Sequence, residues 1–375
     1  MELIRNCTFD KLKVGDSVTV TLTVARLDPD QRTVTLDCAV TNQDGQLMLS
    51  GTEEVIAPPE VHPREPGSRH RDLLAAAQSA PCVRTAVVHP VDAVSLQGAV
   101  EAARAGLIEP VLVGPEAKIR QAAAQANVDL APFRLVPTAH SHAAADAAVA
   151  LARAGEVAAI MKGALHTDEL MHAVVARDTG LRTGRRISHV FAMDVPTYPR
   201  ALLITDAAIN IYPTLEDKRD IVQNAIDLAH ALGIAAPRVA ILSALETVYP
   251  KIASTIEAAA LCKMAERGQI TGAVVDGPMA FDLAVSDEAA RTKGFVSPVA
   301  GQADILVVPD LEAGNMLAKQ LEYLGQAQVA GIVLGARVPI MLTSRADGPL
   351  ARLASCALAA LLVQKNVAPA VIGTP

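Results

Sequence analysis

A hydroxyl, a guanidinium and a carboxylate follow one another closely near the end of the chain. The apolar run 338–342 ends abruptly before Ser344, Arg345 and Asp347. A buried strand that ends this way delivers polar side chains to the edge where open α/β sheets bind ligands. The fixed cation suits an anionic substrate, and the other two groups suit proton exchange. The same residues fit a helix start equally well, with Ser344 or Asp347 as the N-cap.

A second polar cluster follows the apolar run 159–161. Gly163 would let a phosphate approach the backbone, Lys162 would supply charge, and a following helix N-terminus favours an anion. An ordinary helix start with Thr167 as N-cap explains these residues somewhat better. His166 and Asp168 suggest a metal, but no matching cluster of ligands accompanies them in the sequence.

Two further apolar runs end in polar residues. Asp206 and Asn210 flank an apolar step after one run, and Asp276 and Asp282 follow another. Two carboxylates in one loop suit acid–base chemistry, although turn formation is the commoner reason for Asp-Gly-Pro. The basic residues of the segment 182–186 suit either a polyanion or a solvated surface loop.

Composition narrows the classes of protein. The chain has 375 residues with a net charge of −7 and no run of Lys or Arg, which argues against nucleic-acid binding. Its five cysteines lack CxxC spacing, which argues against a disulfide framework or a zinc site. No signal peptide and no long uncharged apolar span occurs, so we expect a cytoplasmic protein that does not cross a membrane.

The first sixty residues differ from the rest. Thr and Val alternate with period two over residues 13–56, and turn sequences divide this region into strands at 17–24, 32–40 and 46–50. This pattern predicts a small β-meander. The Pro-rich stretch 57–67 reads as a linker.

Beyond the linker, strands alternate with helical patterns, which predicts an α/β fold with mostly parallel sheets covered on both faces. No GxGxxG, P-loop or GxSxG motif is present, which argues against a dinucleotide fold, a P-loop enzyme and an α/β-hydrolase. The expected strands span residues 84–89, 110–113, 157–161, 201–205, 238–243, 272–276, 304–308, 330–334 and 339–342.

Several segments together resemble the phosphate acetyl/butyryltransferase family over roughly residues 70–365. The segments that carry the resemblance are 161–171, 188–191, 205–210, 276–282, 309–319 and 343–347. The resemblance implies reversible transfer of an acyl group between coenzyme A and phosphate. Its partners would be acetyl-CoA, phosphate and acetyl phosphate, with coenzyme A as a substrate and no further cofactor or metal.

The resemblance also implies a two-domain fold similar to isocitrate and isopropylmalate dehydrogenases, with the site between the domains. Residues 61–186 and 330–375 would form the first domain. Residues 187–329 would form a second domain, inserted in the first, through which homodimers assemble. Substrate-binding positions would be Lys162, Gly163, His166, Thr167, Asp206, Asn210, Asp276, Asp282, Asn315 and Lys319.

The catalytic residues implied by the resemblance are Ser344, Arg345 and Asp347. Arg345 would hold the phosphoryl group, Ser344 would stabilise an oxyanion, and Asp347 would act as base. In the acetyltransferase branch an aspartate follows the Ser-Arg pair at a longer spacing. Here Ala351 and Arg352 occupy that region, and Asp347 resembles the closer aspartate of the butyryl-like branch.

Residues 1–60 resemble the first and last parts of a MaoC-type hotdog hydratase, as found in bifunctional hydratase/phosphate acetyltransferases. The central helix and the catalytic Asp/His pair are missing, so this segment reads as a truncated β-appendage without hydratase activity. The function expected for the whole chain is phosphate acetyl transfer. Three alternatives remain: butyryl transfer, an oxidoreductase of the related fold, and a non-catalytic acyl-CoA-binding protein.

Overall fold

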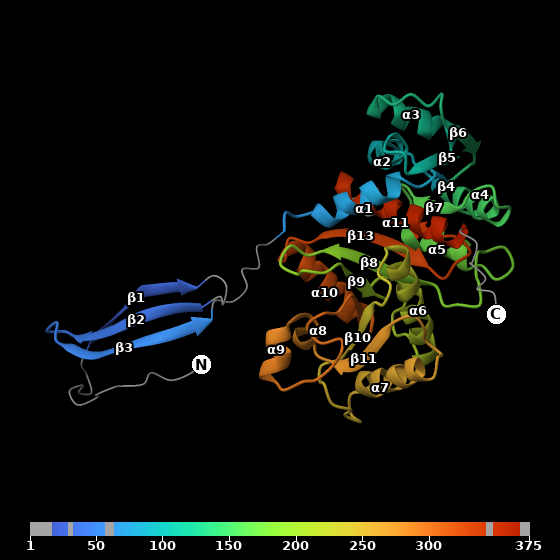
Figure 1. Cartoon of the computed structure of the whole chain (residues 1–375). Coiled ribbons are helices and arrows are strands. Elements are labelled where there is room, and N and C mark those ends of the chain that lie inside the picture. Colours follow the sequence, from blue (N-terminus) through green and yellow to red (C-terminus); the bar gives the residue numbers. More distant parts are fainter. Residues whose placement is uncertain (1–16, 29–32, 57–63, 343–347, 368–375) are drawn as a thin grey trace, which may run out of the picture. The chain divides into compact units, whose positions relative to one another are not determined.

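The computed structural model describes residues 17–28, 33–56, 64–342 and 348–367 (Figure 1). Contacts divide the chain into two compact units, residues 1–62 and residues 63–375. In the first unit, the predicted meander is confirmed as an antiparallel sheet in the order β1-β2-β3. Its strands are β1 (Val18–Asp28), β2 (Thr33–Asn42) and β3 (Leu47–Ile56).

The second unit is built on one sheet of 11 strands in the order β11-β10-β12-β9-β8-β13-β14-β7-β4-β5-β6. Its strands, in chain order, are β4 (Val83–Val88), β5 (Ile108–Gly114), β6 (Arg134–Pro137), β7 (Ala159–Lys162), β8 (Ser188–Asp194), β9 (Leu202–Thr205), β10 (Arg238–Leu242), β11 (Val274–Met279), β12 (Ile305–Val307), β13 (Gln328–Leu334) and β14 (Ile340–Met341).

Strand directions divide this sheet into two parallel halves that run opposite ways. Strands β14, β7, β4, β5 and β6 are parallel to one another, and so are β9, β12, β10 and β11. Between the halves lies the antiparallel pair β8 and β13. The carboxyl ends of the two halves therefore lie at opposite edges of the sheet.

Helices cover both faces of the sheet, as predicted. The buried residues of α1, α2, α3, α6, α7 and α11 share a core with one face, and those of α4, α5, α8 and α9 pack, with α10, on the other. The helices are α1 (Ser68–Gln78), α2 (Ala93–Arg104), α3 (Glu116–Ala126), α4 (Ser141–Arg153), α5 (Thr167–Val175), α6 (Leu215–Ala231), α7 (Ala253–Glu266), α8 (Phe281–Val285), α9 (Asp287–Thr292), α10 (Leu311–Tyr323) and α11 (Pro349–Val367).

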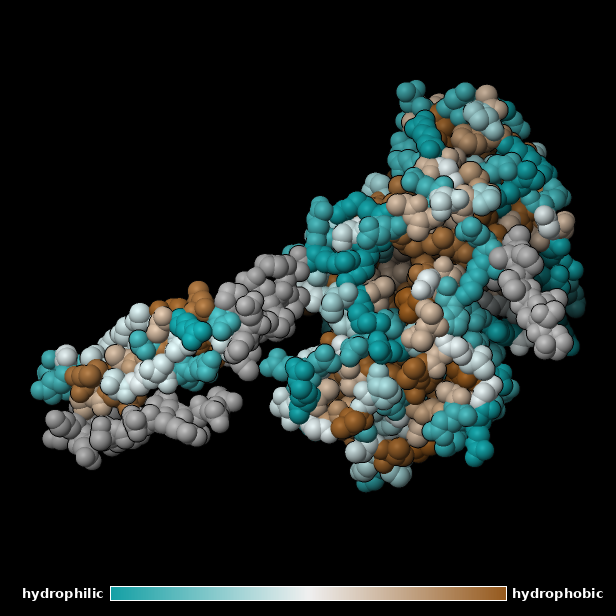
Figure 2. Space-filling view, in the orientation of Figure 1, coloured by the Kyte–Doolittle hydropathy of each residue, from teal (hydrophilic) through white to brown (hydrophobic). Residues whose placement is uncertain are grey.

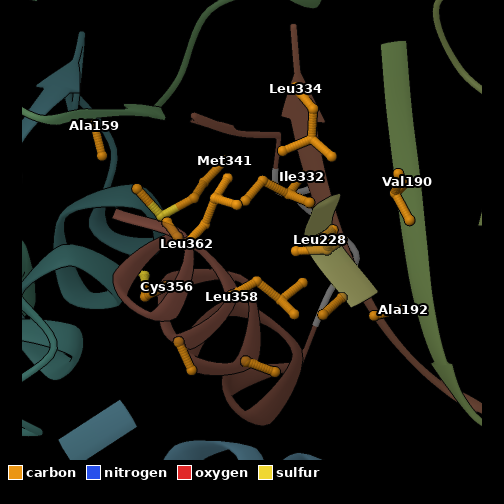
Figure 3. Close-up of a cluster of buried hydrophobic side chains, with 14 of the residues drawn as sticks. Ala159, Val190, Ala192, Leu228, Ile332, Leu334, Met341, Cys356, Leu358 and Leu362 are labelled. Atoms are coloured by element: carbon orange, nitrogen blue, oxygen red, sulfur yellow. The ribbon is translucent and has the colours of Figure 1, made fainter. Parts of the chain in front are cut away.

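Small and branched side chains build the core, because aromatic residues make up only 2% of the chain. Helix α11 packs Leu358 and Leu362 against Ile332 and Met341 of the central strands, with Leu228 of α6 nearby (Figure 3). The Oγ of Ser355 accepts a hydrogen bond from the N–H of Gly331, at 3.0 Å. Helix α11 is thus fixed to the middle of the sheet.

The nine strands expected in this unit are confirmed within a few residues of their predicted bounds. Two strands were missed. Strand β6 is a four-residue edge strand that begins with Arg and ends with Pro, so it shows no apolar run. Strand β8 carries buried polar residues at both ends, and Asn224 Nδ2 donates to the Ser188 Oγ at 2.9 Å, which explains a hydroxyl inside the core. Across the described residues, no helix is long and apolar enough to span a bilayer.

Candidate active site

The connection order places a binding crevice between β4 and β7. From β4 the chain moves outward to β5 and β6, and then returns to the other side of β4 to form β7. Open α/β sheets bind ligands outside the carboxyl ends of the strands at such a switch point. Lys162 ends β7, and His89 directly follows β4, so both lie at this position.

The backbone is closely packed at the end of β7. The N–H of Gly163 donates to the Val88 carbonyl oxygen, and a Cβ at Gly163 would collide with that same oxygen. Only glycine fits there. The Lys162 Nζ lies within hydrogen-bonding distance of the carbonyl oxygens of Gly163 and Leu165. The ammonium group is therefore drawn over the loop between β7 and α5.

His89 belongs to this crevice, although the sequence did not single it out. Its backbone is in the left-handed region, with φ of 58°, a conformation that costs a residue other than glycine roughly 1–3 kcal/mol and is typical of functional sites. The side chain is buried, and its Nδ1 has no hydrogen-bond partner among the described residues. Burial lowers the pKa of His89; Lys118 lowers it further, while Glu169 and Asp92 oppose the shift. The imidazole is thus kept neutral, with hydrogen-bonding capacity to spare.

Helix α5 starts beside these residues. Its N-cap is His166, which makes no capping hydrogen bond through its side chain, so the expectation that Thr167 is the N-cap is wrong. Thr167 instead begins the helix, and both side chains are exposed. Among the described residues, the helix N-terminus therefore has N–H groups without a side-chain acceptor, as an anion site requires.

The motif of Ser344, Arg345 and Asp347 follows β14, the strand next to β7. Strand β14 runs parallel to β7, with Met341 opposite Met161. The segment 343–347, with Ser344, Arg345 and Asp347, comes two residues later and lies outside the described residues. The chain thus enters this segment from the strand next to Lys162.

Asp206 and Asn210 form a buried network at the opposite edge of the sheet. The Asp206 carboxylate accepts hydrogen bonds from the backbone N–H groups of Ala208, Ile209 and Asn210 and from the Asn210 side chain. Burial raises the pKa of Asp206, and these donors counteract part of that shift. The Asn210 Oδ1 accepts from the Nε of Arg186 at 2.6 Å. The network holds the loop after β9 in one conformation.

The loop after β9 lies at the opposite edge of the sheet from the first crevice, and one apolar cluster on a face of the sheet extends between the two regions. Ile209 contacts the same apolar cluster as Leu165, which follows Gly163. From the other side, the Asn315 Nδ2 of α10 donates to the carbonyl oxygen of Ala207 at 3.3 Å. Asn315 is thereby joined to the Asp206 loop.

Three predicted site residues lie apart from this cluster. Asp276 is on β11, the outermost strand, three strand spacings or roughly 14 Å from β9. Asp282 pairs with Lys293 at 2.8 Å, and this contact lowers the pKa of Asp282. Lys319, on α10, pairs with Glu322 at 2.8 Å. The described contacts of these three residues are local.

The basic segment lines a cavity of about 500 Å³ together with the start of α6. Carboxylates neutralise most of its charge: Arg185 pairs with Asp227, and Arg186 with Asp217. Within the described part of the chain, no cluster of three or more residues suited to a metal occurs, around His166 or elsewhere.

Comparison with known proteins identifies the family of this chain. Residues 142–360 match the phosphate acetyl/butaryl transferase family, and the chain belongs to that family. It is 65% identical to a phosphate acetyltransferase of Rhizobium meliloti over 81% of this chain and 96% of that one. It is 41% identical to a phosphate butyryltransferase of Clostridium acetobutylicum over 74% of this chain and 93% of that one.

A solved structure shows the same fold. A branched-chain phosphotransacylase from Enterococcus faecalis superposes with a TM-score of 0.66 at 30% identity, covering 75% of this chain and 99% of that one. A phosphotransacetylase from Streptococcus pyogenes, at 20% identity, gives a TM-score of 0.67. The large sheet of residues 63–375 is therefore the fold of phosphotransacylases.

Proposed function

We propose that this protein transfers an acetyl group between coenzyme A and inorganic phosphate. The observation that carries the proposal is the crevice between β4 and β7. It combines Lys162, the close backbone approach at Gly163 and the uncapped start of α5, and the Ser344-Arg345 segment follows the next strand. The 65% identity to a phosphate acetyltransferase supports acetyl rather than butyryl as the group transferred.

The chemistry requires a base and an anion site. A thiol similar to that of cysteine has a pKa of about 8.5, so coenzyme A is mostly protonated at neutral pH and must lose its proton as the sulfur attacks. In the direction of acetyl-CoA synthesis, the S–C bond forms and the C–O bond to phosphate breaks. The bonding electrons leave with the phosphate, and the base holds the thiol proton.

Each proposed catalytic residue has one task in this scheme. Arg345 holds the phosphoryl group through two parallel hydrogen bonds, a geometry that Lys cannot reproduce. Ser344 donates to the oxyanion that develops on the acyl carbon, and Asp347 accepts the thiol proton. Transfer is direct, in a complex that holds both substrates, so positioning supplies much of the rate.

The remaining predicted residues would bind substrate around this centre. Lys162, Gly163, His166 and Thr167 lie at the crevice and would contact phosphate, whereas Asp206, Asn210 and Asn315 would contact substrate from the loop after β9, at the opposite edge of the sheet. Asp276, Asp282 and Lys319 lie farther out and would contact only the distal part of coenzyme A. Residues 187–329 would act as the second domain and form a homodimer, and residues 1–60 would have no hydratase activity.

The direct test measures free thiol released from acetyl-CoA with and without phosphate, in the absence of nicotinamide and added metal. Release that depends on phosphate, with acetyl phosphate as product, supports the proposal. Release without phosphate, or none from the folded protein, contradicts it. The 41% identity to a phosphate butyryltransferase makes that activity the second candidate. A series from acetyl-CoA to butyryl-CoA distinguishes them, because the acetyl proposal requires the highest kcat/KM for acetyl-CoA.

A further inference from the structure

The small sheet β1–β3 has one apolar face. Strand register places Leu22 opposite Cys38, Val24 opposite Leu36 and Val20 opposite Val40. Side chains of cross-strand partners point to the same side of a sheet, and every second residue repeats the direction. The residues that therefore share this face are Val18, Val20, Leu22, Val24, Leu27, Val34, Leu36, Cys38, Val40, Leu49 and Val55, together with Asn42, Gly51 and one charged residue, Glu53.

The opposite face is mostly polar, although the exposed Leu47 lies on it, opposite Thr41. Thr19, Thr21 and Thr23 alternate with the apolar residues of β1, and Thr52 donates a hydrogen bond from its Oγ1 to the carboxylate of its cross-strand partner Asp37 at 3.1 Å. A face of threonines and carboxylates is stable in water without a partner. The sheet therefore has one face built for solvent and one built for contact.

The apolar face is not covered within the described strands. Leu22 is 57% exposed and Leu27 is 65% exposed, and no side chain with a described burial in β1–β3 is buried. Figure 2 shows apolar side chains at the surface of this sheet. A three-stranded sheet needs a packed apolar face for its stability, so another surface must cover this one.

We propose that this face packs against the same face of a second copy of the chain. The apolar side chains present on the order of 500–700 Å² per copy, as large as the largest patch on a typical monomer. Two copies would bury roughly 1,000–1,400 Å², which reaches the range of specific protein interfaces. A two-fold axis needs a surface that is complementary to itself, and two apolar sheet faces satisfy this by stacking about 10 Å apart.

Cys38 marks the centre of the proposed interface. It lies midway along β2, the central strand, and its neighbour in register on β3 is Gly51, which has no side chain. Its thiol is free and partly exposed. A two-fold axis through the middle of the face brings the Cys38 residues of two copies close together.

The test is cross-linking of the full chain with a short bismaleimide. We expect a cross-linked pair of chains that is absent in the Cys38→Ser variant. The control is Cys82→Ser, which removes an exposed thiol directly before β4 and should leave the product unchanged. Failure to obtain any product that depends on Cys38 overturns the proposal.

A second measurement changes the face without touching the thiol. The double variant Leu22→Thr/Val24→Thr keeps residues that favour strands but removes apolar contact. We expect it to lower the yield of the Cys38 product at least fivefold and to reduce the molar mass by light scattering at low micromolar concentration. The matched control, Thr21→Ser/Thr23→Ser, changes the polar face and leaves both unchanged. Equal yields in the two double variants would contradict the proposed interface, whereas acyl-transfer activity is expected to persist in both.

Discussion

Two strand ends with similar sequence patterns use their polar residues differently. After β7, Lys162 and Gly163 lead into a helix without a side-chain cap, and His89 nearby has a buried Nδ1 that lacks a partner among the described residues. On β11, Asp276 accepts a hydrogen bond from the N–H of Gly277, and after this strand Asp282 pairs with Lys293. The region after β7 therefore has hydrogen-bonding groups that can bind a ligand. At β11, the polar groups instead bond to neighbouring parts of the chain.

The position of each strand in the sheet accounts for this difference. Strand β7 borders the point where the connections reverse direction, so two loops diverge there and leave room for a ligand. Strand β11 is the outermost strand of its half, with a neighbour on one side only. A polar run after a strand therefore indicates a site only together with the strand order.

The largest effect is expected at Arg345. Arg345→Lys keeps the charge but loses the paired hydrogen bonds to phosphate, so kcat/KM for acetyl phosphate should fall by about 10²–10³-fold. Steady-state kinetics, with circular dichroism to verify folding, measure this. Arg337→Lys, on the exposed turn before β14, is the control and should remain close to wild type. A folded Arg345→Lys enzyme with normal use of phosphate would refute the phosphate-holding role.

Substitutions of Asp347 and Asp276 compare the region after β14, the neighbour of β7, with β11. Asp347→Asn removes the proposed base and should lower kcat by about 10²-fold, the usual scale for general base catalysis. Asp276→Asn should change kcat less than twofold, because its carboxylate lies on the outermost strand and accepts a hydrogen bond from the adjacent N–H of Gly277. Normal turnover in Asp347→Asn would move the base elsewhere, and a large loss in Asp276→Asn would show that the outer strand takes part in catalysis.

Gly163→Ala tests the close approach at the end of β7. The added Cβ would meet the Val88 carbonyl oxygen, so the backbone must shift, at a cost of about 1–3 kcal/mol. We expect a lower denaturation midpoint and about a tenfold lower kcat/KM. Gly184→Ala, where nothing lies within 4 Å of the added atom, is the matched control. If both variants behave alike, the crevice tolerates a side chain and the phosphate site lies elsewhere.

His89 should make stability depend on pH in one direction. Its folded pKa lies below the unfolded value of about 6.5, so the unfolded chain binds a proton more readily. Its contribution to the free energy of unfolding is thus constant above that pH and falls as the pH drops below it. His89→Asn should lose less stability than wild type between pH 7 and 5 in urea titrations. His70 and His189 shift the same way, but they cancel in the difference between the two proteins. Parallel pH profiles would mean that His89 is not held neutral.

The smallest effect is expected for Asp282→Asn. The contact of Asp282 with Lys293 is at the surface, where water screens the attraction. Activity should be unchanged, and the melting temperature should move by no more than a degree or two. A clear loss of turnover would place this loop at the reacting centre, and not only at the distal part of coenzyme A.

The sequence predicted strands correctly where a local run of apolar residues coincided with a strand covered on both faces. The runs at β7 and β14 are apolar because both faces of the sheet are covered, and both strands are confirmed close to their predicted bounds. Strand β8 was missed because its inward polar residues, Ser188 and His189, are satisfied or buried by partners distant in sequence. His89 was missed because its significance depends on a backbone angle and on the packing of Gly163, which no local pattern reports. The start of α5 was misjudged by one residue, since Thr167 has the right type but the wrong backbone position.

The pair β8 and β13 has a mechanical consequence. The chain passes from one half of the sheet to the other along β8 and returns along β13, and the two strands are joined by seven residue pairs, from Gln328 and Asp194 to Leu334 and Ser188. The two halves are therefore connected through the hydrogen-bonded strands β8 and β13. A relative rotation of the two halves would therefore have to twist the paired strands β8 and β13. Because α11 is attached to Gly331 of β13 through Ser355, any such twist is transmitted to the helix that follows the Ser344-Arg345 segment.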